Sequence, residues 1–208
     1  GRTPCSPGAT GAGKSILLQT LVTSLILANR PDELNLVLVD FKGGSAFLPF
    51  ENCPHVVALI RNTEDDPAQK FDEAAAQRVL ASVRAEVRRR ESILGRHGGE
   101  IDAYWRARSR NQDLPALPRL VMVFDEYARA MDTSPDFPKE LMAVAGKGRS
   151  LGMHLVFATQ SLQGKLSPEM KNNISLRITL RQNEKSDSVE VLGTPDAVTI
   201  PGRFKGRG

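Results

Sequence analysis

The chain has 208 residues, of which 40% are hydrophobic and 25% charged, and this composition predicts one globular domain with a sizeable core. Its net charge of +4 at pH 7 is small and spread along the sequence, so it permits binding to a polyanion without requiring it. The two cysteines lie far apart, which argues against a disulfide framework or a thiolate metal site and favours a reducing compartment. No apolar run is long enough to span a bilayer, and no signal peptide is recognisable.

Residues 8–15 form the first motif in chain order, and they fit the pattern GxxxxGK[ST] at every fixed position. The motif consists of Gly8, Ala9, Thr10, Gly11, Ala12, Gly13, Lys14 and Ser15. Backbone N–H groups of such a loop, together with the positive end of the helix that follows, bind phosphate groups. Lys14 would contact the β- and γ-phosphates of a nucleotide, and the Ser15 hydroxyl would bind Mg²⁺. The motif predicts a P-loop; a glycine-rich turn that matches by chance is the alternative.

Strands and helices alternate after the P-loop. The predicted helices are the apolar run from the P-loop to about residue 29, residues 69–94, a shorter amphipathic stretch around residues 101–105, and residues 138–147. The predicted strands are residues 34–39, 55–60, 120–124, 153–159 and 175–181. The first of these strands ends at Asp40, and a turn at residues 41–44 follows it. This alternation predicts an α/β fold with a mostly parallel central sheet and helices on both faces.

The strand over residues 120–124 runs directly into two carboxylates, Asp125 and Glu126. A continuous apolar run is typical of a strand buried on both faces of a parallel sheet, and ligands of open α/β sheets bind at the carboxyl ends of the strands. The pattern predicts a Walker B motif in which Asp125 holds Mg²⁺ and Glu126 orients or deprotonates the attacking water. The alternative is a core strand followed by an ordinary helix cap, with Asp125 at the N-cap and Glu126 in the first turn.

Gln160 follows the strand over residues 153–159. In P-loop ATPases whose sheet inserts a strand between the P-loop strand and the Walker B strand, a polar residue at the tip of the inserted strand contacts the γ-phosphate. Gln160 is placed to do this; a surface polar residue at the junction of strand and loop is the alternative.

Taken together, these segments resemble the FtsK/SpoIIIE family of P-loop motor ATPases, and within it the EccC/EssC ATPases of type VII secretion systems. Beyond the P-loop, the resemblance is carried by residues 37–47, 123–126, 148–155, 158–160, 172–178 and 194–197. It implies a RecA-like P-loop NTPase domain over residues 1–208, a fragment of a larger multi-domain protein. It also implies ATP and Mg²⁺ as cofactors and assembly with other copies into a ring, usually a hexamer.

The function implied by the resemblance is an ATP-hydrolysing motor domain that powers translocation, with a secreted protein as its substrate. Two alternatives stay open: a double-stranded DNA translocase of the FtsK/SpoIIIE type and, from a different class, a non-hydrolysing docking module for a secretion signal. The implied location is cytoplasmic, at the cytoplasmic face of the cell membrane in the full-length protein. Membrane association would come only through segments absent from this chain.

Ring motors complete the catalytic site with an arginine from a neighbouring subunit. Arg149, in the predicted turn before the strand over residues 153–159, matches the position at which relatives of this family place that arginine, and Arg177 is the second candidate. The alternative for each is a surface ion pair that contributes little to stability. The arginine run at residues 88–90 is interleaved with Glu86 and Glu91, and it predicts a solvated helix face.

One feature departs from the family pattern. A buried apolar strand should precede the P-loop, whereas residues 1–7 include Pro4 and Pro7 and contain little that favours a strand. We therefore expect the nucleotide site to be destabilised.

Overall fold

In the computed structural model, the described residues are 13–62, 71–134, 136–160, 174 and 176–203. The chain forms two compact units, one made of Gly1–Leu21 with Thr159–Gly208 and a larger one made of Val22–Ala158. Helix α1 (Lys14–Ala28) begins in the first unit and ends in the second. Within the described part of the chain, no helix combines the length and apolarity needed to cross a membrane.

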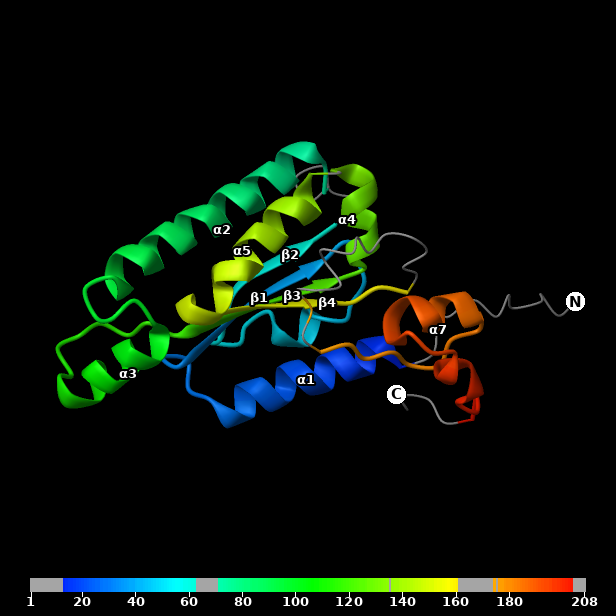
Figure 1. Ribbon diagram of the computed structural model, residues 1–208, viewed down its shortest axis with the longest axis horizontal. Coiled ribbons are helices and arrows are strands. Elements are labelled where there is room, and N and C mark those ends of the chain that lie inside the picture. The colour runs from blue at the N-terminus through cyan, green and yellow to red at the C-terminus, as the bar shows by residue number, and fades with distance from the viewer. Residues whose placement is uncertain (1–12, 63–70, 135, 161–173, 175, 204–208) are drawn as a thin grey trace, which may run out of the picture. The chain divides into compact units, whose positions relative to one another are not determined.

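A parallel four-stranded sheet forms the centre of the larger unit, in the order β2-β1-β3-β4 (Figure 1). Its strands are β1 (Leu34–Asp40), β2 (Val56–Arg61), β3 (Arg119–Asp125) and β4 (Met153–Phe157). β1 and β3 pair in register along their whole length, so that Asp40 lies opposite Asp125. Because the strands are parallel, their carboxyl ends meet at one edge of the sheet. The parallel sheet and the first four predicted strands are confirmed.

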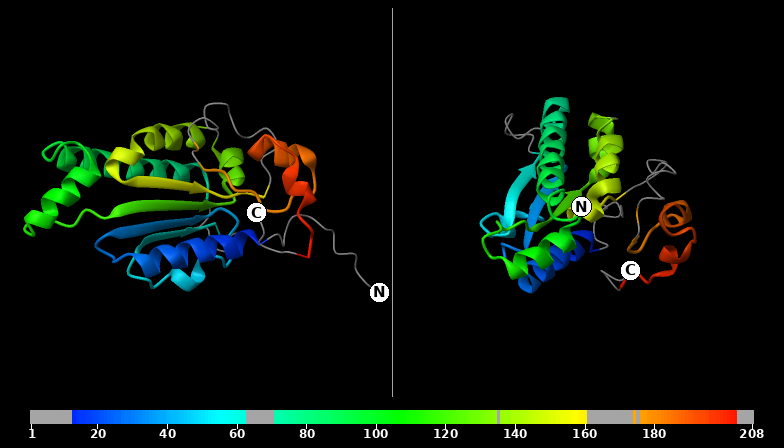
Figure 2. Two further views of the ribbon diagram at one scale, coloured as in Figure 1. Left: turned by 60° about the horizontal axis from the view of Figure 1, so that its bottom comes forward. Right: turned by 60° about the vertical axis from the view of Figure 1, so that its left-hand side comes forward.

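Helices cover the sheet. α2 (Glu73–Leu94) and α5 (Phe137–Leu151) pack against each other on one face, and residues 22–28 of α1 lie on the other (Figure 2). α3 (Ile101–Arg110) precedes β3, and the short α4 (Tyr127–Thr133) follows it. α2 begins later than predicted because the Asp72 side chain accepts a hydrogen bond from the Ala75 N–H at 2.8 Å and caps the helix.

Aromatic rings anchor the carboxyl edge of the sheet. The rings of Phe41 and Phe124 stack with centroids 6.2 Å apart, and Phe157 stacks on Phe124 at 5.5 Å. Phe137 of α5 packs edge-on against both Phe41 and Phe124, at 6.0 and 6.3 Å. Since Phe41 follows Asp40 and Phe124 precedes Asp125, burial of these rings fixes the backbone that carries the two carboxylates.

The predicted solvated face at residues 88–90 is wrong for Arg90. Arg90 as a whole is only 1% exposed, although Arg88 and Arg89 are exposed as predicted. The buried residues of α2 recur at helical spacing through Val83, Val87 and Leu94, and this spacing places Arg90 on the core face.

Hydrogen bonds satisfy the buried Arg90 guanidinium. Nη1 donates to the carbonyl oxygen of Leu151 at 2.9 Å, Nη2 to that of Pro118 at 2.7 Å, and Nε to Glu86 at 2.7 Å. Burial tends to raise the pKa of Glu86, but hydrogen bonds from Arg89 and Arg90 outweigh it and lower that pKa below its usual value. Arg90 thus joins α2 to the end of α5 and to the segment that enters β3.

The smaller unit contains α7 (Lys185–Leu192) and the 3₁₀ turn η3 (Asp196–Thr199). The buried Ser188 hydroxyl donates to the Thr194 carbonyl at 2.7 Å and accepts from the Ala197 N–H at 3.1 Å, which holds the two together. The strand predicted over residues 175–181 is wrong for residues 176–181, which form no ladder with any described strand. Its β-forming sequence has no partner there; residue 175 lies outside the described residues.

Candidate functional site

The two candidate Walker B carboxylates lie where β3 ends. Asp125 and Glu126 are 5% and 7% exposed, and one oxygen of Asp125, Oδ1, accepts a hydrogen bond from the Glu126 N–H at 2.9 Å. α4 begins at Tyr127, and Glu126 occupies its N-cap without a side-chain capping bond. The alternative interpretation of Asp125 as a helix N-cap therefore does not fit the structure.

Glu126 has a left-handed backbone conformation, with φ 55° and ψ 41°. Among the described residues it is the only non-glycine residue with a positive φ. This conformation is unfavourable by about 1–2 kcal/mol for a residue with a Cβ. Strain of this kind persists where the surroundings hold the chain, and it is concentrated at functional sites.

Backbone hydrogen bonds hold the junction of β3 and α4 on both sides. Towards β4, the Tyr127 N–H donates to the Ala158 carbonyl at 3.0 Å, and the Ala158 N–H donates to the Phe124 carbonyl at 2.8 Å. Towards β1, the Phe41 N–H donates to the Asp125 carbonyl at 3.1 Å. The Tyr127 hydroxyl is buried without a hydrogen-bond partner in the described part of the chain, and burial raises its pKa. These bonds fix the direction in which the chain leaves β3.

A third carboxylate, Asp40, lies beside this pair and was not assigned a role from the sequence. It ends β1, is 2% exposed, and its Oδ1 accepts from the N–H groups of Lys42 at 2.8 Å and Gly43 at 3.0 Å. Burial raises the pKa of Asp40; the hydrogen bond from Lys42 opposes this, the negative charge of Asp125 adds to it, and weaker backbone hydrogen bonds from Gly43 and Gly44 oppose it. The available signal was a buried strand ending in Asp before a glycine-containing turn, at the edge where α/β sheets bind ligands.

The described end of the predicted P-loop lies at the start of α1. Gly8, Ala9, Thr10, Gly11 and Ala12 lie outside the described residues. Gly13 has a φ of 98°, which only glycine adopts readily, and its carbonyl accepts from the Leu17 N–H at 2.9 Å, so α1 begins at once. Lys14 is half-buried and Ser15 is exposed in the first turn, where the helix dipole favours negative charge.

The remaining predicted site residues are distributed over both units. Gln160 is half-buried three residues beyond β4 and, like Lys14 and Ser15, belongs to the smaller unit, whereas Asp125 and Glu126 belong to the larger one. Arg149 lies in the last turn of α5, a correction to the predicted turn, because the helix continues to Leu151 and ends at Gly152 with a φ of 68°. Arg177 is exposed and donates to the Val191 carbonyl at 3.3 Å.

The donor chemistry fits a nucleotide with Mg²⁺. Mg²⁺ prefers oxygen ligands, commonly one or two protein oxygens with water and phosphate oxygens completing the shell. A hydroxyl from Ser15 and a carboxylate from Asp125 are ligands of this kind. A buried oxygen of Asp40, Oδ2, has no hydrogen-bond partner among the described residues, as expected beside a site that a hydrated ion would fill.

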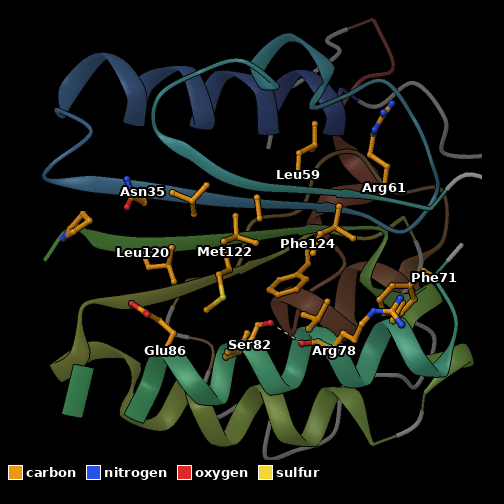
Figure 3. Close-up of a pocket in the computed structure, with 18 of the residues that line it drawn as sticks. Asn35, Leu59, Arg61, Phe71, Arg78, Ser82, Glu86, Leu120, Met122 and Phe124 are labelled. Carbon is orange, nitrogen blue, oxygen red and sulfur yellow. Dashed lines mark hydrogen bonds between the residues drawn. The ribbon is translucent and has the colours of Figure 1, made fainter. Parts of the chain in front are cut away.

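A separate cavity of about 790 Å³ lies between α2 and the sheet (Figure 3). Its wall includes the apolar side chains of Phe71, Met122 and Phe124, with Arg61 and Arg78 among its polar groups. None of Asp40, Asp125 and Glu126 lines it. This cavity, which the sequence did not predict, is distinct from the acidic edge.

Comparisons with known proteins agree with these observations. The family model of the FtsK/SpoIIIE family matches residues 7–195. The chain is 38% identical to ESX-1 secretion system protein EccCa1 of Mycobacterium tuberculosis over 97% of its own length and 28% of the relative's. It is 36% identical to type VII secretion system protein EssC of Staphylococcus aureus over 94% of its length and 13% of the relative's.

A solved structure of the cytoplasmic domain of the Thermomonospora curvata type VII secretion ATPase EccC is also similar. It shares 40% sequence identity with this chain at a TM-score of 0.83, covering 93% of this chain and 22% of the EccC chain. The chain thus spans a minor part of each of these relatives.

Proposed function

Because this chain belongs to the FtsK/SpoIIIE family, with relatives among the type VII secretion ATPases, we propose that it is an ATP-hydrolysing motor domain that powers the export of protein substrates. The observation that carries the proposal is the buried pair Asp125 and Glu126 at the carboxyl end of β3, downstream of an intact P-loop motif. For the whole protein we propose assembly into a ring of copies, attachment to the membrane through other segments, and action at the cytoplasmic face.

Each residue of the site has a distinct task in this proposal. Residues 8–15 bind the phosphates, with Lys14 at the β- and γ-phosphates, and Ser15 and Asp125 hold Mg²⁺. Bound Mg²⁺ would neutralise charge on the β- and γ-phosphate oxygens. Glu126 orients the attacking water and accepts its proton, and Gln160 contacts the γ-phosphate. The left-handed backbone at Glu126 supports its role, because strained conformations of this kind are concentrated at functional sites.

An arginine from a neighbouring copy completes the site, and Arg149 is the better supported of the two candidates. Its side chain is exposed and makes no hydrogen bond or ion pair to any other described residue. Arg177 is already bonded to the Val191 carbonyl of its own chain. An arginine supplied in trans contributes roughly 10³–10⁵ in rate, so turnover should depend on the association of copies.

The test is ATP binding and steady-state hydrolysis across protein concentration, with four variants. Lys14→Ala should lose ATP affinity, and Glu126→Gln should retain binding and lose turnover. Arg149→Ala should lose turnover at every concentration, yet recover part of it when mixed with Glu126→Gln, since a Glu126→Gln copy can lend its intact Arg149 to the site of an Arg149→Ala copy, which keeps Glu126. Lys139→Ala, which removes an exposed lysine outside the site, is the control.

The outcomes separate the proposal from its alternatives. Turnover that rises faster than linearly with protein concentration supports a site completed by a neighbour. Equal turnover in Glu126→Gln and the parent would exclude the role of Glu126. Binding without turnover at any concentration favours the docking module, and stimulation by double-stranded DNA with a steep inverse dependence on salt favours the DNA translocase.

A further inference from the structure

We propose that Asp40 is a positioning residue for the magnesium ion, with its second carboxylate oxygen accepting a hydrogen bond from a water molecule of the ion's hydration shell. This inference rests on the proposed function, because it requires a Mg²⁺-nucleotide at the Walker B edge. Neither the P-loop motif nor the Walker B motif contains Asp40. The inference therefore adds a third acidic residue, from a neighbouring strand, to the site.

The first argument is the register of the sheet. Asp40 and Asp125 end adjacent parallel strands as direct partners, so their side chains project from the same face of the sheet. The Phe41 N–H bond to the Asp125 carbonyl holds the two strand ends together. The Asp40 carboxylate is therefore fixed beside the carboxylate that we assign to the ion.

The second argument is that the two oxygens of Asp40 differ in their surroundings. Oδ1 accepts from the N–H groups of Lys42 and Gly43 and shapes the turn after β1. Oδ2 is equally buried and has no hydrogen bond of normal geometry within the described part of the chain, although the Gly44 N–H lies close enough to the carboxylate to lower its pKa. A carboxylate removed from water without a donor is unfavourable, so a buried acceptor of this kind indicates a missing hydrogen-bond donor.

The third argument is the space kept around Oδ2. A Cβ on Gly44 would lie 3.2 Å from this oxygen, closer than such contacts normally allow. Gly43, with a φ of 74°, lets the turn fold back over the carboxylate. The glycine pair thus bends the chain around Asp40 without placing a side chain against its free oxygen. Outer partners of a metal typically contribute about tenfold to a hundredfold in metal affinity.

Asp40→Asn tests the role of Oδ2 alone. The remaining amide oxygen can still accept from Lys42 and Gly43, while an NH₂ group replaces the acceptor at Oδ2. Asp40→Ala removes both acceptors and reports on the turn. Gly44→Ala leaves the carboxylate in place but puts a methyl group against Oδ2. Asp136→Asn, at an exposed position of the same unit, is the matched control.

The experiment measures the affinity of the 208-residue chain for the non-hydrolysable nucleotide AMP-PNP by calorimetry, once with excess Mg²⁺ and once in EDTA. We expect Asp40→Asn to weaken binding about tenfold to a hundredfold in Mg²⁺ and to leave binding in EDTA unchanged. Gly44→Ala should weaken Mg²⁺-dependent binding in the same direction, and Asp136→Asn should match the parent. The urea midpoint should fall in Asp40→Ala and be preserved in Asp40→Asn.

Three results would overturn the inference. Equal Mg²⁺ dependence in Asp40→Asn, Gly44→Ala and the parent would leave the proposed function standing and remove Asp40 from it. Weaker binding to the same extent in Mg²⁺ and EDTA would mean that Asp40 only shapes the turn. A parent chain that binds AMP-PNP no better with Mg²⁺ would refute the magnesium site of the proposed function and Asp40's part in it together. If Asp40→Asn does not fold, Gly44→Ala alone decides.

Discussion

Replacement of Arg90 by Met should destabilise the protein far more than the same change at Arg89, although the two arginines are neighbours and both bond Glu86. Arg90 is 1% exposed and makes three hydrogen bonds, whereas the Arg89 side chain is 51% exposed. Met keeps the apolar volume of the arginine stem but supplies no donor. Arg90→Met therefore leaves the carbonyls of Leu151 and Pro118 without their donor.

The expected loss of stability follows from the buried acceptors that Arg90→Met leaves without a donor. Each buried acceptor without a donor is unfavourable by about 1–3 kcal/mol, and removal of one member of a buried ion pair costs about 3–5 kcal/mol in all. Arg90→Met should thus lower the free energy of unfolding by roughly 3–5 kcal/mol. Arg89→Met removes an exposed pair and should lower it by about 1 kcal/mol or less.

Urea denaturation measures the difference. With an m-value of about 2–3 kcal/mol/M for a chain of this size, the Arg90→Met midpoint should fall by roughly 1–2 M, and that of Arg89→Met by less than about 0.5 M. Far-ultraviolet circular dichroism reports helix loss, and tryptophan fluorescence follows Trp105 on α3. Equal decreases in the urea midpoint of Arg90→Met and Arg89→Met would refute the argument that burial decides how much each arginine contributes to stability.

Two further predictions concern α5 and the acid stability of the fold. Gly148→Ala should lower the free energy of unfolding by more than about 1 kcal/mol, because its Cβ would lie 2.5 Å from the Met153 carbonyl oxygen. Gly146→Ala lies in the same helix but has open space around it, so it should raise the free energy of unfolding by roughly 0.5–1 kcal/mol. A change of the same sign in both variants, measured by calorimetry, would contradict this. The pKa of Glu86 is lower in the folded chain than in the unfolded chain, where it is about 4.5, so the ionised carboxylate stabilises the fold at pH values above about 4.5. This stabilisation is lost as the pH falls through the lower pKa of the folded state. The stability difference between the parent and Glu86→Gln should therefore be largest at neutral pH and shrink in acid, and a pH-independent difference in urea midpoints would count against it.

Much of the fold could be predicted because its signals are local. The apolar runs that became β1 and β3 are too short for helices and too continuous for exposed strands, and their alternation with helices requires parallel pairing. The position of Asp125 and Glu126 at the end of β3 could be predicted for the same reason, since their motif is contiguous in the sequence. The P-loop stays a prediction, because most of its residues lie outside the described part of the chain. The strand expected over residues 175–181 failed because β-forming residues need a ladder partner, which no local pattern supplies.

The sequence by itself determined the kinds of elements, the GxxxxGK[ST] motif and the family, because periodicity and motif spacing are properties of neighbouring residues. Only the tertiary structure decided that Arg90 is buried, that Glu126 adopts a left-handed turn, and that Asp40 faces Asp125 with one oxygen free. These features depend on strand register and on packing between segments up to 85 residues apart, as in the pairing of Asp40 with Asp125. The backbone has to be assembled before such contacts exist, so composition and spacing cannot specify them.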